Sequence, residues 1–110
     1  MKYIIKESQY DSAILKMGQS LLDSVELPYP QYFPKRTFID KNKDGEHTIV
    51  LSLDKENTDW EELTGKERAD ILWDSYAEVF KIVLELRHMF NDSSIKAIPL
   101  VDVDGQWTRY

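Results

Sequence analysis

The segment 40–45, with the sequence DKNKDG, matches the first half of an EF-hand calcium loop. Such a loop takes oxygen ligands from positions 1, 3, 5, 7 and 9, with glycine at position 6 and a bidentate glutamate at position 12. Counted from Asp40, positions 1, 3, 5 and 6 match, but position 12 is Leu51, which has no side-chain oxygen. We therefore expect a hairpin turn, in which Asp40 and Asn42 cap the local backbone and Gly45 takes a positive φ. A weak cation site at Asp40–Gly45 is the alternative.

Side chains that often carry catalysis are present without a catalytic spacing. Neither His47 nor His88 belongs to a ligand motif such as H-E-x-x-H, and the chain contains no Cys. The four glycines are scattered, the serines lack a nucleophile-elbow context, and the many carboxylates form no pair in an apolar setting. The sequence therefore predicts no catalytic residue, no metal ligand and no cofactor, and we expect a protein that is not an enzyme.

The negative charge is concentrated in one part of the chain. The window 54–78 contains nine acids and three bases, so it accounts for the whole net charge of −6. This argues against direct nucleic-acid binding, which requires a basic surface, and favours a partner protein with a basic surface.

Helical spacing places much of this charge on one stripe. Glu67, Asp70, Asp74 and Glu78 lie on one side of the expected helix, and like charges four residues apart each cost about 0.2–0.5 kcal/mol. A surface retained against this cost could meet a basic patch, although a merely solvated face is the alternative. Trp60 could anchor a partner, or it could pack over the helix start. The predicted partner-binding residues are Asp59, Trp60, Glu61, Glu62, Glu67, Asp70, Asp74 and Glu78.

The helix that carries the stripe should run from the capping box of Thr64 and Glu67 to Phe90, where Asn91 is a plausible left-handed stop. Its apolar arc is about twice as wide as that of an ordinary surface helix. The main face and its two flanks comprise Leu72, Tyr76, Val79, Phe80, Val83, Leu86 and Phe90, then Ile71, Ile82 and Met89, then Trp73, Ala77 and Leu84. Either the proline-rich segment and the C-terminal tail cover the surplus, or a second protein does.

Arg87 lies inside this apolar arc. Its stem could run over the core while its charge complements the helix dipole, or it could pair with an acid of the sheet such as Asp102.

The remaining elements follow from periodicity and turn signals. A helix should begin at the cap Ser8 and extend to Val25, with Gly18 allowing a close backbone approach. Three prolines in seven residues make 26–34 extended, with its aromatic side chains on the core. Strands are expected at 2–6, 37–40, 47–53 and 95–103, the last with Pro99 at an edge or bulge, and Asp104-Gly105 could return a final strand packed on the core through Trp107–Tyr110.

This order, βαββαβ, is that of the ferredoxin-like fold. We expect one α+β domain over residues 1–110, with two helices on one face of an antiparallel sheet and a C-terminal extra strand. No apolar run reaches the roughly 18 residues that a transmembrane helix requires. The apolar stretch near the N-terminus is too short for a secretory signal. A soluble, cytoplasmic protein without membrane contact is therefore expected.

The opening MKYII-KESQY, a short strand leading into a Ser-capped helix, resembles the openings of small accessory proteins encoded by bacteriophages. The resemblance covers about a dozen residues. It implies a small acidic protein that acts by binding, for example by inhibiting a host enzyme.

These observations favour a non-catalytic acidic protein-binding module, an inhibitor or adaptor that meets a basic surface of a host or partner protein. The first alternative is a structural or assembly subunit, a homodimer for instance, that oligomerises through the wide apolar face of the 65–90 helix. The second is a small enzyme or a weak cation-binding domain.

Overall fold

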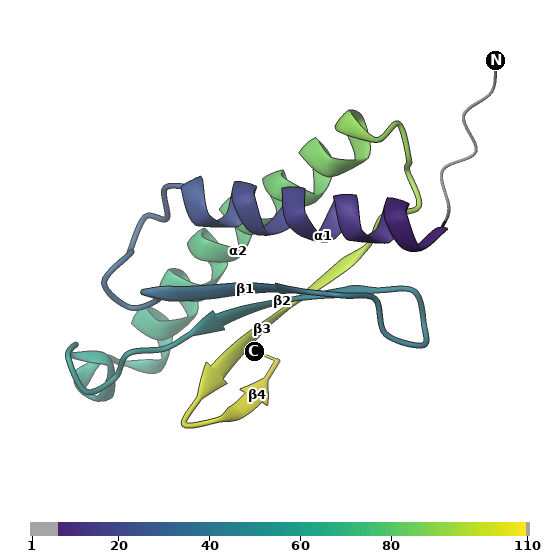
Figure 1. Ribbon diagram of the computed structural model, residues 1–110. Coiled ribbons are helices and arrows are strands. Elements are labelled where there is room, and N and C mark those ends of the chain that lie inside the picture. The colour runs from purple at the N-terminus through teal and green to yellow at the C-terminus, as the bar shows by residue number, and fades with distance from the viewer. Residues whose placement is uncertain (1–6, 110) are drawn as a thin grey trace, which may run out of the picture.

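The structure is a computed structural model that describes residues 7–109 of the 110-residue chain. Within this range, two helices lie on the same side of a four-stranded sheet, whose strand order is β1-β2-β3-β4 (Figure 1). The elements in chain order are α1 (Glu7–Ser24), β1 (Lys35–Ile39), β2 (His47–Ser52), the 3-10 helix η1 (Trp60–Glu62), α2 (Gly65–Met89), β3 (Ala97–Val103) and β4 (Gln106–Thr108).

The sheet is mixed, and this overturns the predicted ferredoxin-like order. The α+β class is confirmed, but the described part of the chain runs α-β-β-α-β-β, and the strand predicted at 2–6 lies outside it. A ferredoxin-like sheet splits its β-α-β units by placing another strand between the two that a helix connects. Here β2 and β3 pair directly and in parallel, from His47 with Ala97 to Ser52 with Asp102, so no strand can lie between them. Only the β1–β2 and β3–β4 pairs are antiparallel.

Helix α1 packs closely on β1 because Gly18 faces the ring of Phe38, as the close-approach prediction required. A Cβ atom at Gly18 would lie 2.8 Å from three atoms of that ring. At the outer edge of β1, the Gln19 side chain makes the hydrogen bonds that a neighbouring strand would otherwise make. Its Nε2 donates to the Arg36 carbonyl at 3.0 Å, and its Oε1 accepts from the Phe38 amide at 2.8 Å. These contacts fix α1 along the sheet edge.

The proline-rich segment after α1 covers part of the core, as predicted. The prediction that it is extended throughout is wrong, because the amides of Tyr32 and Phe33 donate to the carbonyls of Tyr29 and Pro30 in a turn. Leu27, Tyr32 and Phe33 are buried, and Tyr29 is half-buried. The segment is held to the end of α1 by Arg36, whose Nη1 donates to the carbonyls of Leu22 and Val25 at 3.1 and 2.8 Å. The helix dipole and its free carbonyls favour a cation at this position.

The C-terminal hairpin forms where Asp104-Gly105 predicted it, and both residues have positive φ, as a two-residue hairpin turn requires. However, β4 pairs only with Val101–Val103, so the stretch of β3 that contains Pro99 has no neighbour on that side among residues 7–109. This explains how a proline is tolerated in an inner strand. The predicted packing of the return strand on the core is wrong, because the Trp107 side chain is 54 % exposed.

Candidate protein-binding surface

Helix α2 begins and ends where the sequence predicted. The Thr64 hydroxyl accepts from the Glu67 amide at 3.2 Å, and Glu67 accepts from the Thr64 amide at 3.1 Å, which completes the capping box. At the other end Asn91 has φ 49°. The amides of Asn91 and Asp92 donate to the carbonyls of His88 and Arg87, which is the Schellman arrangement. The resulting 25-residue helix is a rigid support for its side chains.

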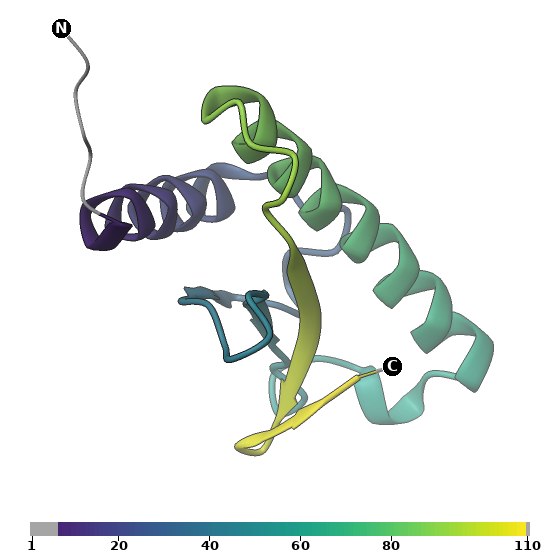
Figure 2. The same ribbon diagram turned by 90° about the vertical axis from the view of Figure 1, so that its right-hand side faces the viewer.

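One side of α2 faces the core and the opposite side faces solvent (Figure 2). At about 100° per residue, Ser75, Val79, Ile82 and Leu86 point inward, and all four are buried. The opposite side of the helix contains Ala77 and the residues three or four positions before and after it. The solvent side of a surface helix is normally polar. Here its middle is apolar.

We name this apolar row the outer seam: Ala69, Trp73, Ala77, Phe80 and Leu84. The Trp73 side chain is 72 % exposed, Leu84 is 60 % exposed and Phe80 is 42 % exposed. They account for three of the five large apolar side chains that are exposed in residues 7–109. No segment of the described chain covers the seam, so its apolar area faces solvent.

The proline-rich segment covers only the other flank of the apolar arc. Tyr29, Tyr32 and Leu63 line a depression with Asp70 and Ile71, and Ile71 is buried. The surplus apolar surface is thus covered from within on the Ile71 flank and left open along the outer seam. At the far end of the Ile71 flank, Met89 is exposed as well.

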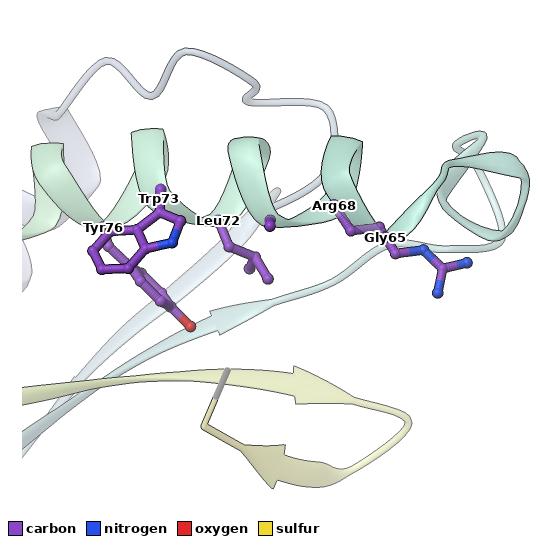
Figure 3. A pocket seen from close by; sticks show the side chains of 6 residues that line it. Gly65, Arg68, Leu72, Trp73 and Tyr76 are labelled. Atoms are coloured by element: carbon purple, nitrogen blue, oxygen red, sulfur yellow. The ribbon is translucent and has the colours of Figure 1, made fainter.

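Two shallow grooves border the outer seam on the side that faces β3. The first has a volume of about 370 Å³ and is lined by α2 residues from Gly65 to Tyr76. Figure 3 shows Leu72 and Tyr76 pointing from α2 toward the β3–β4 hairpin. The second groove, also about 370 Å³, lies between the Phe80–Arg87 part of α2 and Lys96 and Ala97. Seam and grooves together form an apolar strip with a cationic side chain near each end.

Among the predicted partner-binding residues, most of those that precede α2 make contacts within the folded chain. Trp60 is only 4 % exposed, packs edge-on against Tyr32 with 5.7 Å between ring centroids, and lies under the Arg68 guanidinium. Its ring is therefore inside the core, as the alternative of packing over the helix start required. Asp59 accepts a short hydrogen bond from the Tyr32 hydroxyl, and chiefly this bond raises the pKa of Tyr32 to about 12. Glu61 lies 3.8 Å from Lys55 and 3.7 Å from Arg68.

The acids on α2 differ in how far they are engaged. Glu67 serves the capping box, and Glu78 pairs with Lys81 at 2.9 Å. Asp74 accepts only a long hydrogen bond from the Tyr29 hydroxyl at 3.5 Å. Asp70 and Glu62 are exposed. Asp70 and Asp74 thus form an accessible acidic border beside the outer seam, whereas Glu67 and Glu78 have helix-stabilising contacts.

The loop that matches half of a calcium site is the predicted hairpin turn, which connects β1 to β2. Asn42 Oδ1 accepts from the amides of Asp44 and Glu46 at 2.9 and 3.1 Å, and Asp40 accepts from the Lys41 amide. Gly45 has φ 78°. In the part of the chain that the structure describes, no three His, Asp or Glu side chains lie together in a way that could hold a metal ion.

A polar cluster that the sequence did not predict lies beside this loop. The Tyr10 hydroxyl donates to Asp92 at 2.5 Å, joining α1 to the turn after α2, and Asp11 pairs with Lys41 at 3.0 Å. Burial, followed by the bond to Asp92, raises the pKa of Tyr10 to about 12. The Ser94 hydroxyl, followed by Tyr10, lowers the pKa of Asp92 to about 2. The partners are 82 residues apart in sequence, so no local spacing could have indicated them.

Three further side chains left open by the sequence now have a place. His47 is 2 % exposed, its Nδ1 lies 3.0 Å from the Ile39 carbonyl, and its ring packs on Phe38. His88 is exposed on α2. Arg87 donates from Nε to the Ile95 carbonyl at 2.7 Å and is half-buried, while Asp102 accepts from the Gly105 amide. Arg87 therefore fixes the turn after α2, and no ion pair with Asp102 forms.

Comparisons with known proteins give no identification: no protein-family model, no curated protein and no solved structure matches the chain. Within residues 7–109, no helix has the length and apolar character needed to cross a membrane.

Proposed function

We propose that the chain is a non-catalytic protein-binding module and that its contact surface is the outer seam of α2 with the acidic border Asp70 and Asp74. The observation that carries the proposal is the exposure of Trp73, Phe80 and Leu84 in one row on the solvent side of a rigid helix.

Folding alone gives no reason for this row. Side chains that point away from the core add little to folded-state stability, and contiguous exposed apolar surface promotes aggregation unless a partner covers it. Tryptophan is also among the residues that most often dominate the binding energy of protein interfaces. An amphipathic helix that offers apolar anchors at spacings of three and four residues is a common way to bind another protein.

The acidic border indicates the chemistry of the partner's rim. Asp70 and Asp74 have few contacts of their own, so basic side chains at the edge of a partner's apolar patch could pair with them. Such rim pairs mainly accelerate association and make it sensitive to salt, while the apolar centre supplies most of the affinity. An inhibitor or adaptor that meets a basic host surface fits this pattern.

Affinity capture from the cell that encodes the chain tests the proposal, with matched variants of α2. Leu84→Ala removes an anchor of the outer seam, and Met89→Ala removes an exposed apolar side chain from the other flank of the same helix. We expect Leu84→Ala to lose the captured partner and Met89→Ala to retain it. Asp70→Lys with Asp74→Lys should weaken capture, and 0.5 M salt should weaken wild-type capture. Equal capture by the Leu84 and Met89 variants would refute the proposed surface.

An assembly subunit is the second candidate, and the spacing within the outer seam favours it. Its members are separated by four, four, three and four residues, and from Trp73 onward this is the alternation that places residues in the seam of a two-helix coiled coil.

A further inference from the structure

We propose that the outer seam binds a second copy of this chain, with the two α2 helices packed antiparallel about a two-fold axis. This inference rests on the proposed function and names one occupant of the proposed surface. It is carried by the way the exposed residues of α2 complement themselves when the helix is reversed.

The apolar residues form matching layers in this arrangement. A two-fold axis between positions 78 and 79 places each residue of one copy opposite a residue of the second copy, such that the two residue numbers add up to 157. Trp73 then faces Leu84 of the second copy, and Phe80 faces Ala77 of the second copy. Each bulky side chain meets a smaller one, as knobs-into-holes packing requires. All four positions are on the exposed side of α2.

The charged residues match in the same register. An antiparallel two-fold pair brings the same flank of both helices together. On that flank, Lys81 of the second copy lies opposite position 76, two residues from Asp74. Lys81 is exposed beyond its contact with Glu78, so its amino group is available for this pair. The alignment therefore gives two opposite-charge pairs per dimer, one in each direction between Asp74 and Lys81.

A parallel pair lacks this complementarity. It would set Ala77 against Ala77 and Trp73 against Trp73, which leaves a gap in one layer and places two large side chains in another. The antiparallel arrangement also uses the two grooves beside the seam. Leu84 of the second copy lies next to the groove of Leu72 and Tyr76, and Trp73 of the second copy lies next to the groove of Val83.

The dimer would place both acidic stripes on one face of the assembly, because the two-fold axis returns the same flank of each helix to the same side. Glu67 and Glu85, which the pairing leaves free of contacts across the interface, would then extend over both copies. A basic partner would meet a wider acidic surface than a single chain offers.

Cysteine cross-linking of the full chain tests the register, because the natural sequence contains no Cys. In the proposed dimer the Cα atoms of two Ala77→Cys residues lie about 6 Å apart, within disulfide range. Two Ala69→Cys residues lie about 28 Å apart along the axis and cannot be joined. Both alanines are exposed, and Ser20→Cys on the exposed side of α1 measures collisional cross-linking.

We expect a disulfide-linked dimer from Ala77→Cys under mild oxidation, and only the Ser20→Cys background from Ala69→Cys. Efficient cross-linking of Ala69→Cys would indicate a parallel pair and overturn the register. Background cross-linking at both positions, with a monomer in sedimentation at about 100 µM, would overturn the second-copy inference itself. If capture of another protein still depended on Leu84 in that case, the proposed function would stand.

A charge exchange provides a second readout. Lys81→Asp should weaken the dimer, measured by sedimentation, and adding Asp74→Lys in the same chain should restore it toward the wild-type dissociation constant. Leu84→Ala should raise that constant at least about tenfold, because each dimer loses two apolar side chains from its interface. Met89→Ala should change it less than about twofold. No rescue by the charge exchange would contradict the antiparallel pairing.

Discussion

The three tryptophans allow a direct test of whether the outer seam is needed for folding. Trp60 is 4 % exposed and Trp73 is 72 % exposed. Replacing a buried tryptophan by alanine typically costs about 3–5 kcal/mol of unfolding free energy. Trp60 also packs against Tyr32 and Arg68, so we expect the upper half of that range for Trp60→Ala.

The expected cost of Trp73→Ala is much smaller. Roughly a quarter of its side chain is covered, which corresponds to about 50 Å² and about 1 kcal/mol at 25 cal/mol per Å². Alanine recovers about 0.5 kcal/mol through its higher helix propensity. The net loss should therefore be below about 1 kcal/mol, a shift of roughly 4 °C or less in melting temperature.

Urea unfolding followed by circular dichroism measures both variants. It should be run at about 1 µM protein, because association would otherwise add stability that depends on concentration. If Trp73→Ala lost as much stability as Trp60→Ala, the Trp73 side chain would belong to the core in solution. The outer seam would then not be a free surface.

Three further predictions concern the fold around the surface. Gly18→Ala should lower the unfolding free energy by about 1 kcal/mol despite the better helix propensity of alanine, because the new methyl group meets the Phe38 ring. In a Phe38→Leu background the same change should raise the unfolding free energy. Thermal unfolding of the four proteins measures the coupling between the two positions. The Ser94 hydroxyl, followed by Tyr10, lowers the folded-state pKa of Asp92 from 3.8 to about 2, so the stability that Asp92 confers is present above about pH 4 and is lost as pH falls toward 2. The stability difference between wild type and Asp92→Asn, measured by urea unfolding, should shrink over that interval. A constant difference would contradict the contacts of Asp92 with Ser94 and Tyr10. Millimolar calcium should leave the amide resonances near Gly45 unchanged, since Asn42 Oδ1 is already used by the loop backbone, and a saturable shift would show a cation site there.

Local patterns predicted the individual elements well. The capping box at Thr64, the left-handed Asn91 and the two Gly-containing turns all depend on residues near one another in sequence. The close approach at Gly18 was predicted, but its partner Phe38 was not. The strand pairing could not be predicted in the same way. Whether β2 and β3 pair directly depends on how a 25-residue helix crosses the sheet, and periodicity does not specify that crossing.

The candidate surface was only partly predictable for a related reason. The sequence identified both the acidic stripe and the surplus apolar arc of α2, but not which flank the proline-rich segment covers. Charge is visible in the sequence, but the contacts of each acid are not. Glu67 is engaged by the Thr64 amide and Glu78 by Lys81. Trp60 packs against Tyr32, 28 residues earlier in the chain, so the sequence alone left open whether Trp60 anchors a partner or packs over the helix start.

Fluorine NMR of the chain labelled with 5-fluorotryptophan tests the central claim most directly, because each tryptophan reports on a different environment. Spectra would be compared for dilute protein, concentrated protein and protein in lysate of the cell that encodes it. The Trp73 resonance should shift or broaden on concentration or in lysate, while Trp60 keeps its chemical shift and Trp107 serves as an exposed control. If the shift and the width of the Trp73 resonance stayed as constant as those of Trp107 under all three conditions, the claim that the outer face of α2 binds another protein would be contradicted.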